Sequence, residues 1–399
     1  MKKILAVNSG SSSFKYKLFS YPDEKVIASG MADRVGMSNS VFTMKLADGT
    51  VFEEVKDIAS QEKAVEKLLT WLQENNVISD LSEIAGVGHR VVAGGEEFKD
   101  STIITEDNIW KIYNMSDYAP LHNAAEADGI YAFMKVLPGV PEVAVFDTSF
   151  HQTLDPVHYL YSVSYDYYLK YRARKYGAHG TSVRYVANRA ADLLNKPLKD
   201  LKMIVCHLGS GASITAVKDG KSYDTSMGFS PVAGLTMSTR SGDIDPSVVQ
   251  FIMKKNKMTK FDDAIYMLNN NSGLLGISGI SPDMRELQEA ANNGDKRAKL
   301  AIDIFINRIV RYIGSYFMEM GGLDAIVFTA GVGEHEAGIR KRIMDQMSAT
   351  GLIIDEEANN TNGEKVITTP ESKITAMIIP TDEELMIERD VVRLANLED

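Results

Sequence analysis

The sequence predicts an α/β protein built from two similar, duplicated domains. Five short apolar runs each end abruptly in small, polar or charged residues, which is typical of buried strands that carry a ligand site at their carboxyl ends. A strand, a loop rich in glycine and serine, and a hairpin occur near residue 8 and again near residue 207. A chain of 399 residues also exceeds what one hydrophobic core usually supports, so we expect two cores.

The apolar runs have the same form and are expected to lie side by side in sheets. They cover residues 4–7, 143–146, 203–206, 325–328 and 376–379, and each is followed at once by a polar or glycine-rich segment. The first polar segment leads into strand-like residues 14–19, a turn at 21–24 and a run at 26–28. The third leads into 213–217 and the turn 218–221, whose Asp219-Gly220 is a strong hairpin signal.

Helices are expected between these units. Residues 61–74 place Ala64, Val65, Leu68, Leu69 and Leu72 at helical spacing, and residues 296–317 are expected to bury Leu300, Ile304, Ile309 and Ile313. The last helix, 384–397, is predicted to cross back to the first domain. The expected domains are therefore 1–150 plus 383–399, and 151–382.

Composition excludes several classes of protein. The net charge of −11 and the lack of a long basic block argue against a nucleic-acid surface. Cys206 is the only cysteine, which excludes an intrachain disulfide and fits a reducing cytosol. The apolar start breaks at Asn8, too soon for a signal peptide or a membrane span. We expect a cytoplasmic protein that binds neither nucleic acid nor membrane.

The loops 8–13 and 209–213 are suited to phosphate, because small residues let backbone N–H groups approach the oxygens. Each loop alone is more typical of a tight turn, but two on matching hairpins favour a phosphate site. Asp147 and Glu383 stand where they can hold magnesium, whereas Asp382 is better interpreted as a helix N-cap. The Gly-x-Gly at 331–333 is a weak signal whose position makes nucleotide contact plausible.

Arg90 and Arg240 are candidate anion-binding residues, because small neighbours would let each guanidinium face a cleft. Among the histidines, His179 is the best functional candidate, since glycines flank it. A hydrogen-bonded structural histidine is the alternative. No histidine pair has the spacing of a zinc site, so none is expected.

Taken together, these segments resemble the acetate kinase family, within the acetate and sugar kinase, heat-shock and actin superfamily. The matching segments are 7–15, 88–92, 119–123, 146–153, 179–182, 225–229, 272–279 and 328–334, in order along residues 3 to about 389. The resemblance implies two duplicated actin-like (ribonuclease H-like) domains with a nucleotide cleft between them, usually in a homodimer. The N-terminal domain would be the acyl-substrate side, and 151–382 would bind the nucleotide.

The resemblance also implies a role for each site residue. Asn8 and Glu383 would hold Mg²⁺, or Mn²⁺ in its place. Arg90 would bind the acyl carboxylate in a pocket formed by Val92, Leu121 and Pro231. Asp147 would be the active-site acid, and His179 and Arg240 would stabilise the transferring phosphoryl group. ATP or ADP would be contacted by Lys15, His207, Leu208, Gly209, Ser210, Gly211, Asp283, Met284, Arg285, Gly331, Val332, Gly333, Glu334 and His335.

The expected reaction is direct transfer of the ATP γ-phosphoryl group to acetate. A carboxylate is already a nucleophile at neutral pH, so positioning and charge neutralisation are what the site must supply. Propionate or butyrate as acceptor is the nearest alternative, since one methylene changes discrimination by only about 1–3 kcal/mol. A sugar or polyol kinase, with Asp147 as base, and an actin-like ATPase without transfer are further alternatives.

At five positions the chain departs from the commoner family pattern. These positions are Ala93, Ala178, Val183, Ser210 and Ser238. None has an assigned catalytic role, so the departures bear on rate and acceptor range more than on reaction type.

Overall fold

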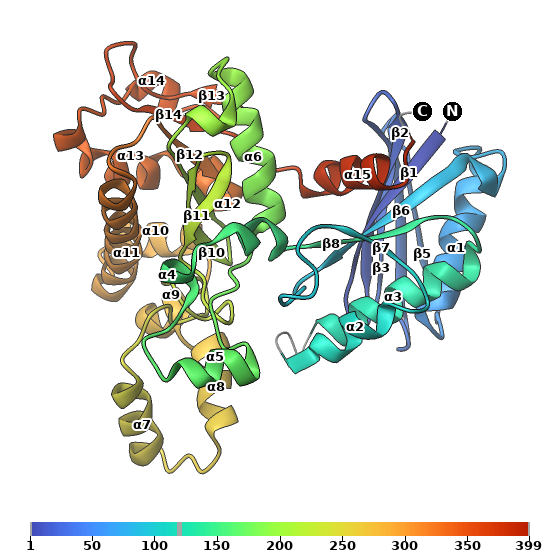
Figure 1. Cartoon of the computed structure of the whole chain (residues 1–399), viewed down its shortest axis with the longest axis horizontal. Helices are drawn as coiled ribbons and strands as arrows, with labels where there is room; N and C mark the ends of the chain where they lie inside the picture. The colour runs from blue at the N-terminus through green and yellow to red at the C-terminus, as the bar shows by residue number, and fades with distance from the viewer. Residues whose placement is uncertain (1, 118–121, 398–399) are drawn as a thin grey trace. The chain divides into compact units, whose positions relative to one another are not determined.

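The computed structural model describes residues 2–117 and 122–397, which form two compact units (Figure 1). The first unit holds residues 1–149 together with 382–399, and the second holds 150–381. The chain therefore passes from one unit to the other twice, after Ser149 and after Thr381. Within the described ranges, every helix is too short or too polar to cross a membrane.

The first unit is an eight-stranded sheet with helices on its faces. Its elements are β1 (Lys2–Ser9), β2 (Phe14–Tyr21), β3 (Lys25–Asp33), β4 (Val41–Leu46), β5 (Val51–Val55), α1 (Gln61–Glu74), β6 (Ile84–Val91), β7 (Thr102–Ile104), α2 (Ile109–Asn114), α3 (Asn123–Val136), β8 (Glu142–Phe146) and α15 (Glu383–Leu394). The strand order is β5-β4-β3-β2-β1-β6-β8-β7. Strands β1 to β5 form an antiparallel meander, and β6 and β8 run parallel to β1.

The second unit contains a six-stranded sheet and a larger set of helices. Its strands are β9 (Met203–Leu208), β10 (Ala212–Lys218), β11 (Lys221–Thr225), β12 (Ala325–Thr329), β13 (Lys365–Val366) and β14 (Thr375–Ile378). Its helices are α4 (Pro156–Tyr159), α5 (Tyr165–Tyr171), α6 (Gly180–Leu193), α7 (Pro246–Lys255), α8 (Phe261–Asn270), α9 (Gly273–Ser278), α10 (Met284–Asn292), α11 (Lys296–Met320), α12 (Ala330–His335), α13 (Ala337–Asp345) and α14 (Glu356–Asn359). The strand order is β11-β10-β9-β12-β14-β13.

The two sheets share one topology. In each, three consecutive antiparallel strands are followed by two strands parallel to the first, in the order β3-β2-β1-β6-β8 and β11-β10-β9-β12-β14. This order is that of the actin-like, ribonuclease H-like domain. The predicted fold class, α/β with two duplicated actin-like domains, is confirmed.

The helical spacing of apolar residues predicts the buried face correctly for α1 and only in part for α11. Helix α1 buries all five predicted apolar residues against the first sheet, and Ser60 caps its first turn. Helix α11 is longer than expected, and Leu300 is 51% exposed while Ile304 is only partly buried. Ile309 and Ile313 are buried as predicted, but nearer the start of α11 the buried residues are Ala301 and Phe305, so the prediction for Leu300 was wrong. The predicted stripe is therefore correct for the second half of the helix and one position out of register at its start.

The strand ends also differ from the sequence expectation. Strand β9 extends beyond the predicted run 203–206 to include His207 and Leu208, because both residues pair with β10. The hairpin between β10 and β11 has positive φ at Asp219 and at Gly220, as a tight two-residue turn requires.

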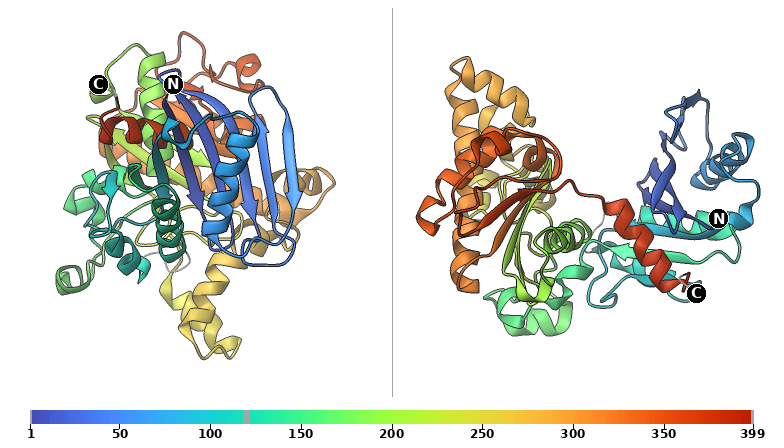
Figure 2. Two further views of the ribbon diagram at one scale, coloured as in Figure 1. Left: turned by 90° about the vertical axis from the view of Figure 1, so that its right-hand side faces the viewer. Right: turned by 90° about the horizontal axis from the view of Figure 1, so that it is seen from above.

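Helix α15, which lies near the end of the chain, packs on the sheet of the first unit (Figure 2). It covers β6 closely because Gly86 and Gly88 have no side chains. A methyl group on Gly88 would lie 2.3 Å from Cγ2 of Ile387. Asp382 caps the helix by accepting from the Leu385 N–H, as its interpretation as an N-cap predicts. Glu383 is thereby fixed in the first turn of α15.

Candidate functional site

The first unit gathers charge at the carboxyl ends of β6 and β8. These strands are parallel neighbours, with Arg90 opposite Val145, and the Asp147 N–H donates to the Val91 carbonyl. Arg90 and Asp147 therefore leave the same edge of the sheet on the same face. Nη2 of Arg90 donates to Oδ2 of Asp147 at 2.5 Å. The charge of Asp147 raises the pKa of Arg90, so this guanidinium stays protonated.

Two further carboxylates surround Arg90. Oε2 of Glu383 lies 3.9 Å from Nε of Arg90, and Glu126, on α3, accepts from the Val92 N–H at 2.9 Å. Burial raises the pKa of Glu383 to about 7, and the charge of Asp147 adds to this shift. Burial likewise raises the pKa of Glu126 to about 7. The site thus holds more potential negative charge than Arg90 alone can balance.

This surplus fits a small divalent cation. Carboxylate and amide oxygens are the donors that Mg²⁺ takes, usually together with substrate phosphate and water. Glu383 and Asp147 provide carboxylates, and Asn8 stands near the carboxyl end of β1 with its side chain exposed. Lys15 pairs with Asn8 across the β1–β2 ladder, where it also is exposed. The donor set is chemically suited to magnesium.

The acyl-pocket residues are only partly brought together. Val92 is half-buried beside Glu126 at the end of β6, next to Arg90. Leu121 lies outside the described residues. Pro231 belongs to the second unit, whereas Val92 belongs to the first.

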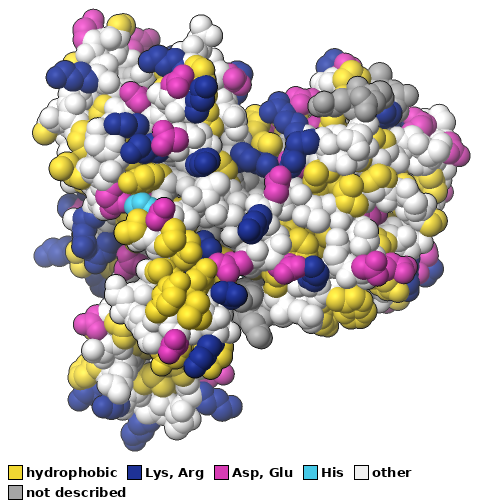
Figure 3. Space-filling view, viewed as in Figure 1, with side chains coloured by type: hydrophobic (Ala, Val, Ile, Leu, Met, Phe, Trp, Pro, Cys, Tyr) yellow, Lys and Arg dark blue, Asp and Glu magenta, His cyan; other side chains and the backbone are white. Residues whose placement is uncertain are grey.

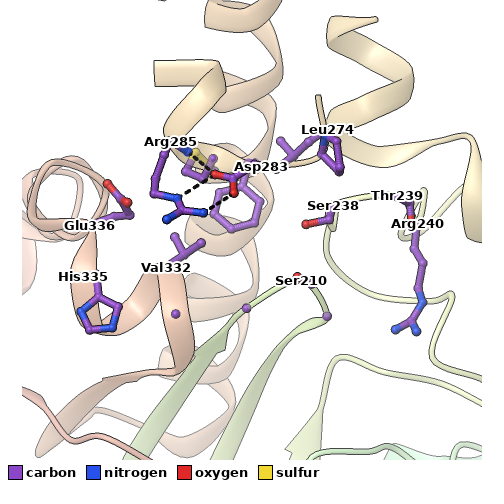
Figure 4. Close-up of a pocket in the computed structure, with 16 residues that line it drawn as sticks. Ser210, Ser238, Thr239, Arg240, Leu274, Asp283, Arg285, Val332, His335 and Glu336 are labelled. Carbon is purple, nitrogen blue, oxygen red and sulfur yellow. Dashed lines mark hydrogen bonds and ion pairs between the residues drawn. The ribbon is translucent and has the colours of Figure 1, made fainter. Parts of the chain in front are cut away.

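The second unit contains a cavity of about 700 Å³ at the carboxyl ends of β9 and β12 (Figure 4). The turn 209–211 and the start of α12 form one side of it. Arg285 extends over the cavity, held by Asp283 through Nη2–Oδ2 at 2.6 Å and Nε–Oδ1 at 3.1 Å. These hydrogen bonds from Arg285 lower the pKa of Asp283 to about 2. The volume lies in the usual range for small-molecule sites.

Most of the sequence-predicted nucleotide residues line this cavity. Those that do are Gly209, Ser210, Gly211, Asp283, Met284, Arg285, Gly331, Val332 and His335, together with Arg240. Others do not: Leu208 is fully buried in the core, and Gly333 packs against the backbone of Phe328. Oε1 of Glu334 accepts from the backbone N–H groups of Ala330 and Thr381, which stabilises the turn into α12.

His179 and Arg240 meet at the turn 209–211. A methyl group placed on Gly211 would lie 3.3 Å from Nε2 of His179 and 3.4 Å from Nη1 of Arg240. Glycine at this position therefore leaves room for both side chains to approach the same point. Burial lowers the pKa of Arg240, yet an arginine remains charged at neutral pH.

A row of hydrogen bonds orients the His179 ring. Its Nδ1 is 3.0 Å from Oγ of Ser213, and the ring stacks on His207 with the centroids 4.0 Å apart. His207 in turn contacts Ser182, whose hydroxyl lies 2.8 Å from that of Thr381. The backbone of His179 is left-handed, with φ of 61°, just before α6. His207 thus lies beneath His179 instead of lining the cavity itself.

Sequence reasoning missed several residues of both half-sites. Glu126 lies 34 positions from its partner Val92, so no local pattern could reveal it. Glu336 lines the cavity and accepts from Gln288 at 2.6 Å. Ser238, Thr239, Leu274, Pro282 and Phe305 also line it. Extending the glycine motif two residues past Glu334 would have found Glu336.

Two of the atypical positions, Ser210 and Ser238, face the cavity, and the Ser238 N–H donates to the Ser210 carbonyl. Ala93, Ala178 and Val183 are buried. Those three therefore act through packing.

Comparison with known proteins gives one consistent answer. The sequence profile described as the Acetokinase family matches residues 3–389. A protein named acetate kinase from Lacticaseibacillus paracasei is 54% identical over 397 residues, which cover 99% of this chain and 100% of the relative. The acetate kinase of Bacillus subtilis is 53% identical over 396 residues, with the same coverage.

Solved structures agree with the sequence relatives. The crystal structure of Porphyromonas gingivalis acetate kinase matches with a TM-score of 0.95 and 41% identity, covering 99% of this chain and 100% of that one. A propionate kinase from Francisella tularensis matches with a TM-score of 0.91, also at 41% identity and with the same coverage.

Proposed function

Because the chain belongs to the acetokinase family, we propose that it reversibly transfers the γ-phosphoryl group of ATP to acetate, giving acetyl phosphate and ADP. The observation that carries this proposal is the Arg90 site. A half-buried guanidinium beside half-buried Val92 is suited to an acceptor with one anionic and one apolar end. An ATPase without an acceptor would have no use for it.

On the acceptor side, Arg90 would bind and orient the carboxylate. Its Nη2 is engaged by Asp147, which fixes the plane of the guanidinium and leaves further N–H donors of the five for the acceptor. Acetate is ionised at neutral pH, so no residue has to remove a proton from it. Asp147 accordingly acts by orienting Arg90 and by its negative charge, and transfer is a direct in-line displacement.

On the nucleotide side, the second unit would supply charge neutralisation. The cavity lined by the turn 209–211 and the start of α12 would hold ATP or ADP. Arg240 and His179, which converge at Gly211, would meet the oxygens of the phosphoryl group in flight. In the tautomer whose Nδ1 accepts from the Ser213 hydroxyl, Nε2 of His179 would carry the proton and could donate a hydrogen bond to a phosphoryl oxygen.

Asn8, Glu383 and Asp147 would hold the magnesium ion. When bound, Mg²⁺, or Mn²⁺ in its place, neutralises charge on the ATP phosphates and helps to orient them. The raised pKa of Glu383 means that this carboxyl is partly protonated near pH 7, so cation binding and proton release are coupled.

Propionate is the second candidate acceptor. The Francisella tularensis relative is named a propionate kinase and has the same fold. Since a single methylene in an apolar pocket is worth only about 1–3 kcal/mol, both acids can be expected to react, with acetate preferred.

Hydroxylamine trapping tests the proposal directly. Incubated with ATP, Mg²⁺ and acetate, the protein should form acetohydroxamate, whereas an ATPase without transfer would release only phosphate. Arg90→Ala should lower kcat/KM for acetate roughly 30- to 1,000-fold, because a charged hydrogen bond to the acceptor is lost. Kinetics with acetate, propionate and butyrate would rank the acceptors.

The matched control is Arg311→Ala, an exposed arginine on α11 that should leave kcat and KM unchanged. If Arg90→Ala is as active as this control, Arg90 does not bind the acceptor. If ATP is consumed without any acid-dependent hydroxamate, the proposed reaction is wrong.

We further propose that the protein acts in the cytoplasm as a homodimer. Figure 3 shows hydrophobic side chains gathered over the α4–α5 region of the second unit. We call the exposed residues Val163, Tyr165, Tyr167, Leu169 and Tyr171 the α5 surface; each is at least half exposed. Tyrosine-rich apolar surfaces of this kind are typical of protein interfaces.

A further inference from the structure

Three potential metal ligands from distant parts of the second unit come together outside the nucleotide cavity. His158 lies in α4, Asp224 near the end of β11, and Glu319 in the last turn of α11. Their donor atoms all lie within 4.8 Å of one another. Nδ1 of His158 is 3.6 Å from Oδ2 of Asp224 and 4.0 Å from Oε2 of Glu319. These distances are too long for hydrogen bonds.

Each carboxylate has one oxygen already held by another group. Oδ1 of Asp224 accepts from Nζ of Lys175 at 2.6 Å and from the Thr225 N–H at 2.7 Å. Oε1 of Glu319 accepts from the Ser315 hydroxyl at 2.7 Å. The second oxygen of each carboxylate is the one nearest His158. Such outer hydrogen bonds are how metal-binding carboxylates are usually oriented.

The His158 ring is also held in place. It packs against the ring of Tyr223 with the centroids 4.6 Å apart, and its side chain is only 14% exposed. Asp224 is similarly buried, whereas the Glu319 side chain is 37% exposed. Two carboxylates against one Lys175 leave one net negative charge around the imidazole. His158 and Asp224 are therefore held in place, whereas the more exposed Glu319 side chain can move.

We infer that His158, Asp224 and Glu319 form a binding site for a divalent transition-metal ion of the Zn²⁺ type. Three donors about 2.1 Å from a tetrahedral ion stand about 3.4 Å apart. The His158–Asp224 separation of 3.6 Å therefore needs to close by about 0.2 Å and the His158–Glu319 separation of 4.0 Å by about 0.6 Å, while the two carboxylate oxygens, which lie within 4.8 Å of each other, must also approach. The exposed Glu319 side chain can supply the remaining movement. Water would complete the coordination.

The donor set distinguishes this site from the magnesium site. One imidazole with two carboxylates suits Zn²⁺, Mn²⁺ or Co²⁺, whereas Mg²⁺ prefers oxygen alone. Phe305 lines the nucleotide cavity, and Glu319 follows it by fourteen residues, about 21 Å along the axis of α11. A metal ion here would therefore act by linking α4, β11 and α11 and not by contacting phosphate. The inference does not depend on the proposed reaction.

Metal binding to the full chain tests the inference. Chelator-treated protein is dialysed against Zn²⁺ with excess Mg²⁺ present throughout, and bound zinc is measured by elemental analysis. The wild type should bind one zinc ion more than His158→Ala or Glu319→Gln. Saturating Zn²⁺ should also raise the melting temperature of the wild type by roughly 5 °C and leave that of both variants unchanged. Acetate-dependent turnover should be the same in all three proteins.

Two control variants identify the site. Glu289→Gln, an exposed glutamate on α10, and Glu383→Gln, at the magnesium site, should both retain the additional zinc ion. Co²⁺ should give visible absorption bands in the wild type that are lost in His158→Ala and also in the milder His158→Gln. Equal zinc content in the wild type and the His158 and Glu319 variants would overturn the inference. So would cobalt bands that persist without His158.

Discussion

At the scale of single residues, the first unit contains acidic side chains whose ionisation depends on their surroundings. Glu388, in α15, is fully buried, and neither of its carboxyl oxygens has a hydrogen-bond partner within residues 2–117 and 122–397. Burial raises its pKa to about 7, and the charge of Glu24 adds to this shift. In the unfolded chain the same group would titrate near its ordinary value of 4.5. Folding therefore favours the protonated form of Glu388.

This shift predicts a loss of stability as the pH rises. Between about pH 4.5 and pH 7 the unfolded chain releases this proton while the folded chain keeps it, so the free energy of unfolding falls across that window. Glu388→Gln should remove this contribution. At pH 8 the variant should be more stable than the wild type by up to about 3 kcal/mol, and at about pH 3.5, below both pKa values of Glu388, the two should be equal.

Urea unfolding at both pH values measures the difference. Glu106→Gln, an exposed glutamate in the same unit, serves as the control and should follow the wild type at both pH values. A Glu388→Gln variant with the same pH dependence as the wild type would show that Glu388 is ionised in the folded protein.

At the scale of elements, the close contact of α15 with β6 connects the fold to the site. The helix begins at Glu383, and its buried residues Ile387 and Val391 lie directly over Gly88. Any side chain at Gly88 would push the helix outward, because a methyl group there would lie 2.3 Å from Cγ2 of Ile387 and 2.8 Å from Cγ2 of Val391. The position of a proposed magnesium ligand thus depends on the absence of a side chain one strand away.

Gly88→Ala is expected to lower the free energy of unfolding by roughly 1–3 kcal/mol, as overpacking of a close contact usually does. Gly314→Ala is the matched control, because Gly314 is exposed in the middle of α11 and an added methyl group meets nothing within 4 Å. It should raise stability by about 0.5–1 kcal/mol through helix propensity. Denaturant unfolding measures the free energy of unfolding of both variants. If the two substitutions have equal effects, α15 can shift to accommodate the added methyl group at Gly88 without loss of stability.

At the scale of the whole molecule, the α5 surface is the region through which we expect two copies of the chain to associate. A monomer rarely leaves a contiguous surface of tyrosines, leucine and valine in water. If this surface joins two copies, the wild type should have twice the mass of 44.0 kDa in solution. A charged residue at its centre should separate the copies, since burying an unpaired charge is costly.

Leu169→Lys should therefore shift the molar mass, measured by light scattering after size-exclusion chromatography, from that of the dimer to that of the monomer. Val51→Lys changes an equally exposed apolar residue in the first unit and should remain dimeric. A Leu169→Lys variant that keeps the double mass would place the interface elsewhere.

Much of the fold could be predicted from the sequence because strands and turns have local signatures. The apolar runs, the Asp219-Gly220 hairpin and the buried face of α1 all depend on residues close together in the chain. At the start of α11 the buried face was predicted wrongly, because Leu300 and Ala301 both fit the helical period and only the packing of neighbouring elements decides which of them is buried.

The two duplicated α/β domains, the family and the residue types at each strand end could all be inferred from the order of residues alone. Which of those residues meet became clear from the folded chain. Arg90 and Asp147 are 57 positions apart, and His158, Asp224 and Glu319 belong to three separate elements. The physical reason is that local pattern reports whether a side chain is buried, whereas its partners are chosen by how strands pair and helices pack, and residues far apart in the chain fix that choice.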